Sequence, residues 1–367
     1  MRILVVNAGS SSLKLRVLDE ADAVVASRDL PAPGGQTDGA VLRGAMRELG
    51  TVEAVGHRIV HGGTLYSAPV RVTPEVVRRL ETLTDLAPLH QPKSLAALAA
   101  VSAVLPDVPA VACFDTAFHA SMPAAAATYA LPPQWRRRWE LRRYGFHGLS
   151  HAYASERAAA LLGRPREALR LVTCHLGAGA SLAAVAAGRS VDTTMGFTPL
   201  EGLVMATRSG SVDPGLVLWL EEHVGMPPAE LAATLEHRSG LLGLAGTSDM
   251  RAILAAEAAG DADAALAVAV YLHRLRGSIA AMVAAMGGLD GLVFTGGVGE
   301  NSAEIRRRAV EGLGFLGVAL DPERNQRGKG DRPIGTDGAV PSLVVAARED
   351  LQIAREVRAV LGTEAAR

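Results

Sequence analysis

The chain begins with an apolar run, a small polar turn, and a segment in which apolar and charged residues alternate. Residues 3–6 are Ile-Leu-Val-Val, and from residue 13 onward apolar positions alternate with Lys14 and Arg16. Apolar runs are typical of buried strands, and strict alternation is typical of half-buried ones. Residues 3–18 are therefore predicted to form a β-hairpin. Its tip of Asn, Gly and serines would let the backbone approach phosphate oxygens, with Lys14 beside it.

A second segment repeats this pattern about half a chain later. Residues 171–185 comprise an apolar run, a tip rich in Gly and Ser, and another apolar run. The repetition predicts either an internal duplication that holds a ligand between two halves, or two unrelated glycine-rich hairpins.

Further elements follow from caps, periodicity and glycine positions. Helices are predicted for residues 38–49, 94–105 with Ser94 as the N-cap, 262–286 and 349–361, and a buried strand ending in a carboxylate for residues 109–116. Residues 191–215 are polar and lack clean periodicity, which predicts a long loop, and such loops are usually functional. The helix at 262–286 would suit a subunit interface or the core equally well.

Several charged residues allow two interpretations. Arg58 lies among apolar neighbours, where a charge is costly without a partner, so it either forms a structural ion pair or binds an anion. Asp115 follows a buried strand and either contacts a ligand or caps a helix. Ser248 or Asp249 is a candidate N-cap, and Glu349 favours a helix start unless a metal lies nearby.

A strand, a glycine-rich loop and a helix succeed one another at residues 292–303. The loop and the helix N-terminus would offer N–H groups to an anion, which moderately favours a nucleotide. The chain lacks the GxxxxGK[ST] pattern, so it is not a P-loop protein.

Composition narrows the class of protein. The 367 residues suggest two domains, 49% apolar residues allow a large core, and a net charge of −1 argues against a nucleic-acid partner. Cys113 and Cys174 form no metal-binding or disulfide pattern, which fits a reduced, cytoplasmic setting. We find neither a signal peptide nor an apolar run of membrane-spanning length, so no membrane partner is expected.

Together these segments resemble the short-chain carboxylate kinase family, to which acetate kinases belong. The motifs extend over nearly the whole chain: NAGSSSLK, GHRIVHGG, LAPLHQP, FDTAFH, RRYGFHGLSH, CHLGAGAS, the block 195–214, and FTGGVGENS. The resemblance implies an α/β, duplicated ribonuclease H-like (actin/sugar-kinase/Hsp70-like) two-domain fold with an ATP cleft between the domains. It implies one domain of residues 1–148 plus 350–367, a second of residues 149–349, and a homodimer.

The implied reaction is reversible transfer of the ATP γ-phosphoryl group to acetate by in-line displacement, giving acetyl phosphate and ADP. A carboxylic acid with a pKa of about 4–5 is already ionised at neutral pH, so no strong base is needed. Catalysis would come from cations and positioned donors. The alternatives are a propionate or butyrate kinase of the same family, or a nucleotide-dependent switch module on the same fold.

The resemblance assigns roles residue by residue. Asp115, His147 and Arg208 match catalytic positions, although we expect Asp115 to orient Arg58 or the metal and not to take a proton. Arg58 would bind the substrate carboxylate, and Val60, Leu89, Phe146 and Pro199 would surround its methyl group. Asn7 and Glu349 match the positions for magnesium, for which manganese could substitute. The nucleotide positions are Lys14, Ser10, Ser12, His175, Leu176, Gly177, Ala178, Gly179, Asp249, Met250, Arg251, Gly297, Val298, Gly299, Glu300 and Asn301.

Two departures from the family pattern stand out. Ala178 replaces the usual Asn, which removes a side-chain donor worth about 1.5–3 kcal/mol when its hydrogen bond is charge-assisted. The chain is also shorter than usual between Asp19 and Ala54, where none of the motifs lies.

Overall fold

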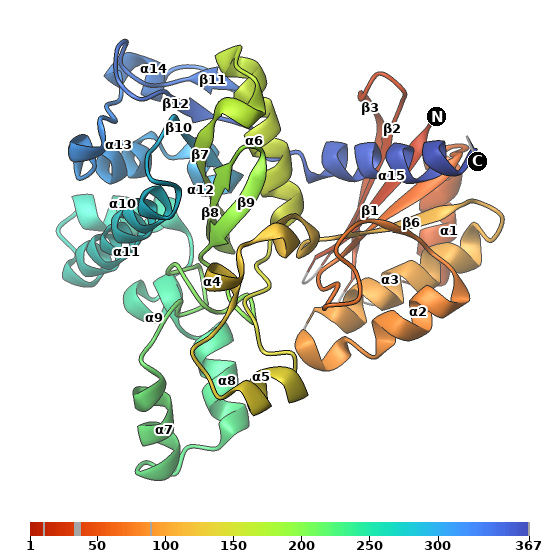
Figure 1. Ribbon diagram of the computed structural model, residues 1–367, viewed down its shortest axis with the longest axis horizontal. Coiled ribbons are helices and arrows are strands. Elements are labelled where there is room, and N and C mark those ends of the chain that lie inside the picture. Colours follow the sequence, from red (N-terminus) through yellow and green to blue (C-terminus); the bar gives the residue numbers. More distant parts are fainter. Residues whose placement is uncertain (10–11, 33–37, 89, 366–367) are drawn as a thin grey trace. The chain divides into compact units, whose positions relative to one another are not determined.

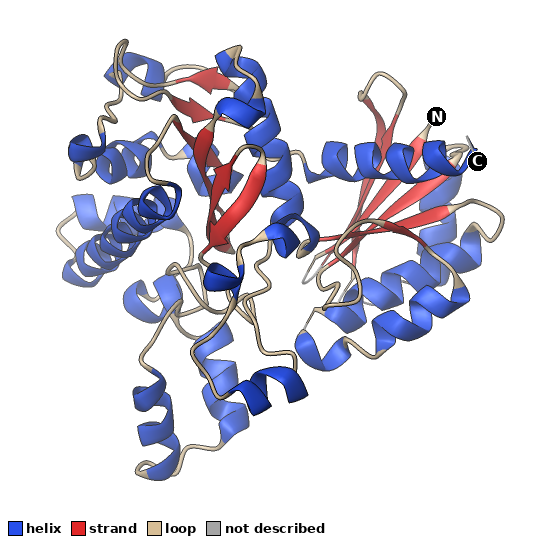
Figure 2. Ribbon diagram, viewed as in Figure 1, coloured by secondary structure: helices blue, strands red, loops and turns tan. Residues whose placement is uncertain are grey.

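Both predicted hairpins are present, and each forms part of a six-stranded sheet (Figures 1 and 2). The computed structural model describes residues 1–9, 12–32, 38–88 and 90–365. The chain divides into two units. The first comprises Met1–Ala120, Phe146–Tyr153 and Arg348–Arg367, and the second comprises Ser121–Gly145 and Ala154–Ala347. The domain limits inferred from sequence remain a prediction.

The first unit contains one sheet with helices on both faces (Figure 1). Its strands are β1 (Ile3–Ala8), β2 (Ser12–Leu18), β3 (Val24–Pro31), β4 (Ala54–Ile59), β5 (Val70–Arg71) and β6 (Ala110–Phe114). Its helices are α1 (Gly39–Leu49), α2 (Pro74–Glu81), the 3-10 turn η2 (Thr84–Leu86), α3 (Gln91–Val104) and α15 (Glu349–Ala365). The turn η3 (Ala117–Ser121) and helix α6 (Gly148–Leu162) extend from this unit into the second.

Alternation along the strands explains how this sheet is covered. Leu4 and Val6 of β1 belong to a buried cluster with α1 and α3, and Leu42 and Val101 are among its members. The opposite face is covered by α15, which packs on β1, β4 and β6. Because successive side chains of a strand point to opposite faces, one short hairpin sequence serves both layers.

The second unit has its own sheet and a larger set of helices. Its strands are β7 (Arg170–Leu176), β8 (Ala180–Ala186), β9 (Arg189–Thr193), β10 (Gly291–Thr295), β11 (Arg332–Pro333) and β12 (Ser342–Val344). Its helices are α4 (Ala124–Ala127), α5 (Pro133–Arg138), α7 (Pro214–Glu222), α8 (Pro228–His237), α9 (Gly240–Ala245), α10 (Met250–Ala258), α11 (Ala262–Met286), α12 (Gly296–Asn301), α13 (Ala303–Glu311) and α14 (Pro322–Gln326), with 3-10 turns η4 (Arg166–Ala168) and η5 (Gly314–Leu316).

The two sheets have the same topology. The strand order is β3-β2-β1-β4-β6-β5 in the first and, in the corresponding direction, β9-β8-β7-β10-β12-β11 in the second. In each, the central three strands are parallel and the outer pairings are antiparallel. Two unrelated hairpins do not account for a match over six strands, so the duplication is the better interpretation. The predicted duplicated α/β fold is confirmed.

Three sequence-based expectations need correction. Helix α3 begins at Gln91, not Ser94, because Pro92 fits the first turn of a helix, where its missing N–H is not needed. The glycine-rich segment before α13 is itself helical, as α12, directly after β10. By length and composition alone, α11 could span a membrane, although no such segment was expected.

Helix α11 nevertheless has the contacts of a core helix. It packs against β8, β9 and α10, and its buried side chains include Val268, Leu272 and Ile279. A long helix in a protein core meets the same length and hydropathy criterion as a membrane span.

A glycine in β4 makes the close packing of α15 possible, and this can be tested. A Cβ atom added at Gly56 would lie 2.4 Å from Cγ2 of Ile353 and 2.8 Å from Cγ2 of Val357. We expect Gly56→Ala to lower the free energy of unfolding by about 1–3 kcal/mol, the usual cost of overpacking. Urea unfolding measures it. Gly44→Ala is the control: it lies in α1 with no atom within 4 Å of the new Cβ, so it should stabilise by about 0.5–1 kcal/mol. Equal effects at the two sites would contradict the packing argument.

Candidate active site

In the first unit, three predicted site residues lie at or near the carboxyl ends of neighbouring parallel strands. Asn7 is near the end of β1, Arg58 is in β4, and Asp115 directly follows β6. The strands pair in the order β1-β4-β6, so their ends share one edge of the sheet. This edge is where open α/β sheets bind ligands.

Arg58 is the centre of this cluster. Its Nη2 lies 2.5 Å from Oδ2 of Asp115 and its Nε lies 3.1 Å from Oδ1, while its Nη1 donates to Oδ1 of Asn7 at 3.2 Å. Oε2 of Glu349 lies 3.7 Å from Nε, and the Arg58 side chain is 17% exposed. The structural ion pair considered from the sequence therefore exists, and it leaves two N–H groups of the guanidinium, one on Nη1 and one on Nη2, without these partners.

Burial and charge act in opposite directions on this pair. Burial raises the pKa of Asp115 to about 6, and Arg58 opposes that rise. Burial also disfavours the charge on Arg58, but Asp115 and Glu349 outweigh it and raise the pKa of the guanidinium. At neutral pH the pair is charged, with Asp115 holding Arg58 in a two-point geometry.

Asn7 and Glu349 form a second contact at the same edge. Nδ2 of Asn7 donates to Oε2 of Glu349 at 3.2 Å, and the Glu349 side chain is 19% exposed. Glu349 is the first residue of α15. The amide group of Asn7 thus lies beside the Glu349 carboxylate through its nitrogen, while its oxygen accepts from Arg58.

The remaining predicted residues of this unit range from buried to exposed. Val60 is 6% and Phe146 1% exposed, and the ring of Phe146 contacts His61 with centroids 5.4 Å apart. His147 has φ +57°, a left-handed backbone conformation unusual outside glycine. Lys14 pairs with Asn7 in the hairpin, and the carbonyl of Ser12 accepts from Gly9 N–H. Ser10 and Leu89 lie outside the described residues.

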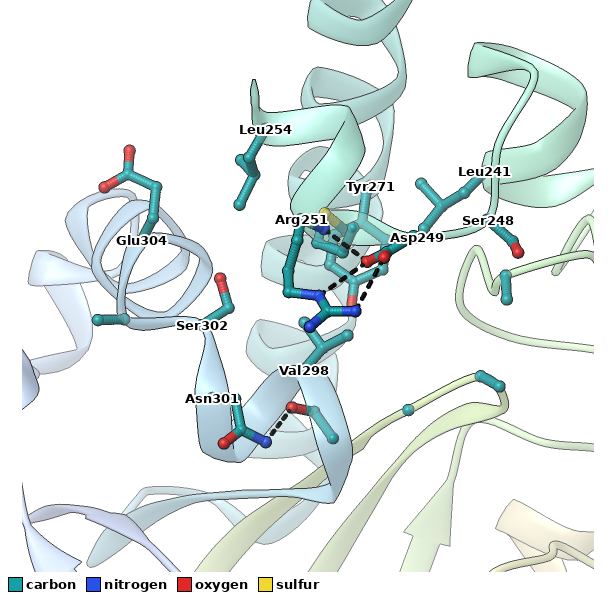
Figure 3. Close-up of a pocket in the computed structure, with 16 residues that line it drawn as sticks. Leu241, Ser248, Asp249, Arg251, Leu254, Tyr271, Val298, Asn301, Ser302 and Glu304 are labelled. Atoms are coloured by element: carbon teal, nitrogen blue, oxygen red, sulfur yellow. Dashed lines mark hydrogen bonds and ion pairs between the residues drawn. The ribbon is translucent and has the colours of Figure 1, made fainter. Parts of the chain in front are cut away.

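In the second unit, half of the predicted nucleotide residues line one cavity of about 650 Å³ (Figure 3). Those on its walls are Gly177, Ala178, Asp249, Met250, Arg251, Gly297, Val298 and Asn301. The walls come from the β7–β8 hairpin tip, the start of α10 and the helix α12.

Glycines allow two backbone segments to meet at this cavity. Gly296 has φ +77°, and a Cβ atom there would lie 2.8 Å from the carbonyl oxygen of Leu176. A Cβ at Gly177 would lie 3.9 Å from the backbone nitrogen of Gly297. Bare backbone at both tips suits the close approach of a polyphosphate.

Polar side chains near the mouth are held by one another. Asp249 caps α10 by accepting from Arg251 N–H, as predicted, and its carboxylate pairs with the Arg251 guanidinium at 3.0 Å. Nδ2 of Asn301 donates to the carbonyl of Gly297 at 2.8 Å. Arg251 is 89% exposed and so remains accessible to a ligand.

The cavity also differs from the prediction. Sequence reasoning did not assign its other wall residues to the nucleotide site: Ala206, Leu241, Ser248, Leu254, Tyr271, Ser302, Ala303 and Glu304. Ser248, Ser302 and Ala303 adjoin predicted segments, so extending those segments would have found them; Leu241 and Tyr271 carry no such signal. Conversely, His175, Leu176, Gly179, Gly299 and Glu300 do not line the cavity, and Lys14 and Ser12 belong to the first unit. The carboxylate of Glu300 instead accepts from Ala347 N–H.

Arg208 lies in the second unit, in the predicted polar loop. Its Nη1 donates to the carbonyl of Pro199 at 2.6 Å, and burial lowers the pKa of its guanidinium. Among the described residues, no carboxylate lies within ion-pair distance of it. Arg208 is thus a half-buried cation held by a neutral acceptor.

The equivalent sheets define a duplicated two-domain α/β protein, and comparison with known proteins identifies the family. A model described as the acetokinase family matches residues 40–355. An acetate kinase of Deinococcus deserti is 45% identical, with 99% of both chains covered. The chain belongs to the acetokinase family.

Solved structures agree with this membership. The crystal structure of Porphyromonas gingivalis acetate kinase matches with a TM-score of 0.90 and 36% identity, covering 98% of this chain and 99% of that one. A propionate kinase from Francisella tularensis matches with a TM-score of 0.91 and 34% identity, with the same coverage.

Three buried histidines near the first cluster predict an acid-sensitive first unit. Burial lowers the pKa of His57, His61 and His119 to about 4, from an ordinary value of 6.5. The unfolded chain therefore binds more protons below pH 6.5, and stability is lost as pH falls from 6.5 towards 4. We expect each histidine to remove about 1 kcal/mol of unfolding free energy between pH 7.5 and 5.5.

Urea titrations at the two pH values measure this loss. His57→Leu should reduce the pH dependence by about one histidine's share, whereas His223→Leu, at an exposed position, should leave it unchanged. An unfolding free energy that does not fall at pH 5.5 would show that these rings are protonated in the folded protein.

Proposed function

We propose that the chain transfers the γ-phosphoryl group of ATP to acetate, giving acetyl phosphate and ADP, and catalyses the reverse reaction. One observation carries the proposal: the chain is similar over its whole length to proteins named acetate kinase. The site geometry supports it, because a carboxylate and a polyphosphate repel each other and the described sites supply cations for both.

Arg58 is the proposed carboxylate-binding residue. Asp115 occupies one side of the guanidinium, and Asn7 occupies one further N–H. The two remaining N–H groups suit a carboxylate with its two oxygens. Asp115 is accordingly proposed to orient Arg58 and not to act as a base, since the acid substrate is already ionised. Val60, Leu89, Phe146 and Pro199 are proposed to surround its methyl group.

Arg208 and His147 are proposed to stabilise the phosphoryl group during transfer. The positive charge of Arg208 is not neutralised by a directly paired carboxylate, because its hydrogen-bond partner is a carbonyl. Such preorganised cations are what phosphoryl transfer requires, since the negative charge spreads over the oxygens of the transferred group.

The cavity of the second unit is proposed to bind the nucleotide. Its apolar walls include Leu241, Met250 and Val298, which suit a base, and its glycine-bearing tips suit phosphates. The proposed nucleotide residues outside its walls, including Lys14, Ser10 and Ser12, are expected to contact phosphate oxygens.

Magnesium is proposed to bind through Asn7 and Glu349. The two side chains lie in contact, and each carries an oxygen of the hard type that magnesium prefers. In the structure Asn7 presents its nitrogen to Glu349, so its amide would have to turn to place its oxygen on the ion. Two protein ligands suffice for an ion that retains waters and phosphate oxygens. The described residues include no group of three or more His, Cys, Asp or Glu that could enclose a metal, which fits an ion that arrives with the nucleotide. When bound, it would neutralise phosphate charge.

Propionate is the second candidate substrate, because a solved propionate kinase is equally similar in structure. One methylene in an apolar pocket changes discrimination by only about 1–3 kcal/mol.

The assay is acyl hydroxamate formation from magnesium-ATP, hydroxylamine, and acetate, propionate or butyrate. We expect product with acetate, with the largest kcat/KM of the three. Arg208→Ala should lower kcat about 10²- to 10³-fold, the usual effect of removing a transition-state donor. Arg324→Ala, which breaks a surface ion pair with Asp337, is the control. Silence with all three acids would overturn the proposal, and a preference for propionate would reassign the substrate.

We also propose that the protein is cytoplasmic and forms a homodimer. From the sequence, the 262–286 helix suited an interface or the core equally well, and α11 has the buried side chains of a core helix. The short helix α7 has no buried residue and exposes Leu216, Leu218 and Trp219 by 47–54%. An exposed cluster of large apolar side chains is typical of a surface that binds another protein, here a second copy of the chain.

Light scattering after gel filtration tests the dimer. We expect twice the chain mass of 38.1 kDa for the unmodified protein, and a shift towards monomer for Trp219→Arg. Trp135→Arg, equally exposed on α5, is the matched control that should stay dimeric. An unmodified protein at the monomer mass across micromolar concentrations would contradict the proposal.

A further inference from the structure

A polar cluster in the second unit holds the loop that precedes Arg208. We call Tyr129, Arg143 and Glu201 the Glu201 knot. One carboxylate oxygen of Glu201 accepts from the Tyr129 hydroxyl at 2.6 Å, and the other accepts from Nη2 of Arg143 at 2.7 Å. The Arg143 guanidinium also lies over the Tyr129 ring, 5.5 Å from its centroid. The three side chains therefore fix one another.

The knot binds the backbone of residues 194–201 at several points. Nη1 of Arg143 donates to the carbonyls of Thr194 and Met195 at 3.2 and 3.0 Å, and the Tyr129 hydroxyl accepts from Phe197 N–H at 2.9 Å. The carbonyl of Gly196 accepts from two further N–H groups, those of residues 144 and 145. Together these hydrogen bonds hold the backbone of residues 194–197 against the knot and against residues 144 and 145.

Gly196 shows how closely the loop approaches the knot. A Cβ atom added there would lie 1.7 Å from Oε2 of Glu201 and 2.2 Å from the Tyr129 hydroxyl. No larger side chain fits at this position unless the knot opens. The loop backbone and the knot thus form one closely packed unit.

The loop ends in the group that directs Arg208. Two residues before Glu201, the carbonyl of Pro199 accepts from Nη1 of Arg208 at 2.6 Å. Glu236 acts on this guanidinium only through longer-range electrostatics, and no carboxylate among the described residues forms an ion pair with it, so the carbonyl is its directing hydrogen-bond partner. A carbonyl sets direction only if it is itself fixed, and Pro199 lies between two points that the knot holds, Phe197 and Glu201.

We propose that the Glu201 knot is a positioning device for Arg208: it fixes the Pro199 carbonyl and thereby aims the guanidinium. This inference rests on the proposed function, in which Arg208 acts on the phosphoryl group. Tyr129, Arg143 and Glu201 are positioning residues, since they act through Pro199 and not on a reacting atom. Loosening the knot should destabilise the transition state more than it weakens the binding of either substrate.

The first test is the division between kcat and KM. Tyr129→Phe removes the hydroxyl and keeps the ring under Arg143, so the variant should fold. We expect kcat of hydroxamate formation to fall about tenfold, with the KM for ATP within twofold of the unmodified value. Glu201→Gln should act in the same direction. The control is Glu257→Gln, which weakens another half-buried ion pair of this unit, with Arg308 at 2.7 Å, and should leave kcat unchanged.

The second test asks whether the effect passes through Arg208. In an Arg208→Lys background, the planar fork that Pro199 aims is absent. Tyr129→Phe should then lower kcat less than twofold, because interacting sites are not additive. The same tenfold loss in both backgrounds, or an unchanged kcat in the first test, would overturn the inference.

A third readout does not depend on activity and so separates this inference from the proposed function. Phenylglyoxal modifies accessible guanidinium groups, and peptide mass spectrometry reports the rate at Arg208. We expect that rate to rise severalfold in Tyr129→Phe and to stay constant in Glu257→Gln, with the exposed Arg251 as an internal reference. An unchanged rate would overturn the inference, even if the hydroxamate assay supports the reaction. A raised rate in a protein without phosphotransfer would support the knot and reject the proposed function.

Discussion

A guanidinium that is largely buried needs a counter-charge close to it. Arg58 is such a group, and the cluster around it in the first unit provides that charge. Its side chain is 17% exposed and its main partner, Asp115, is 1% exposed. Losing either partner would leave an uncompensated buried charge, which costs several kcal/mol. Arg58, Asp115 and Glu349 together carry one more negative than positive charge. Asp115 and Glu349 thus offset the charge of Arg58, and the excess negative charge is what the proposed magnesium ion would balance.

The repeated sheet explains why the two units contribute different chemistry. In both, parallel strands bring their carboxyl ends to one edge. In the first unit these ends carry side chains, with Arg58 near the end of β4. In the second, β7 and β10 run into glycine-bearing turns, and Gly177 and Gly297 of these turns line the cavity with backbone instead of side chains. One topology thus provides a charged surface in one unit and a bare cradle in the other.

Features that are set by residues close in sequence could be predicted, whereas features that depend on tertiary packing could not. The hairpins, α11 and the cap at Asp249 are set by residues close in sequence, so periodicity and capping were sufficient. The start of α3 was predicted too late because serine is a favourable N-cap residue, which drew the prediction to Ser94. Pro92 was the better signal, since proline is tolerated in the first turn of a helix and marks an earlier start. Tyr271 lines the cavity of the second unit because of the way α11 packs, which no local sequence pattern records.

Arg58 is held by a charged carboxylate and Arg208 by a neutral carbonyl. This difference suits the two proposed tasks, binding of the acid substrate and stabilisation of the phosphoryl group. Arg58 is fixed by a carboxylate, which reduces its net attraction for anions but gives it a two-point geometry that a monovalent acid can share. Arg208 is fixed by a carbonyl, which contributes a dipole and no opposing charge. At 4 Å and an effective dielectric of 20, two unit charges interact by about 4 kcal/mol. A carboxylate partner would cancel much of that attraction. A neutral acceptor preserves it, but a single carbonyl fixes direction only when its own loop is rigid, and the knot around Glu201 supplies that rigidity.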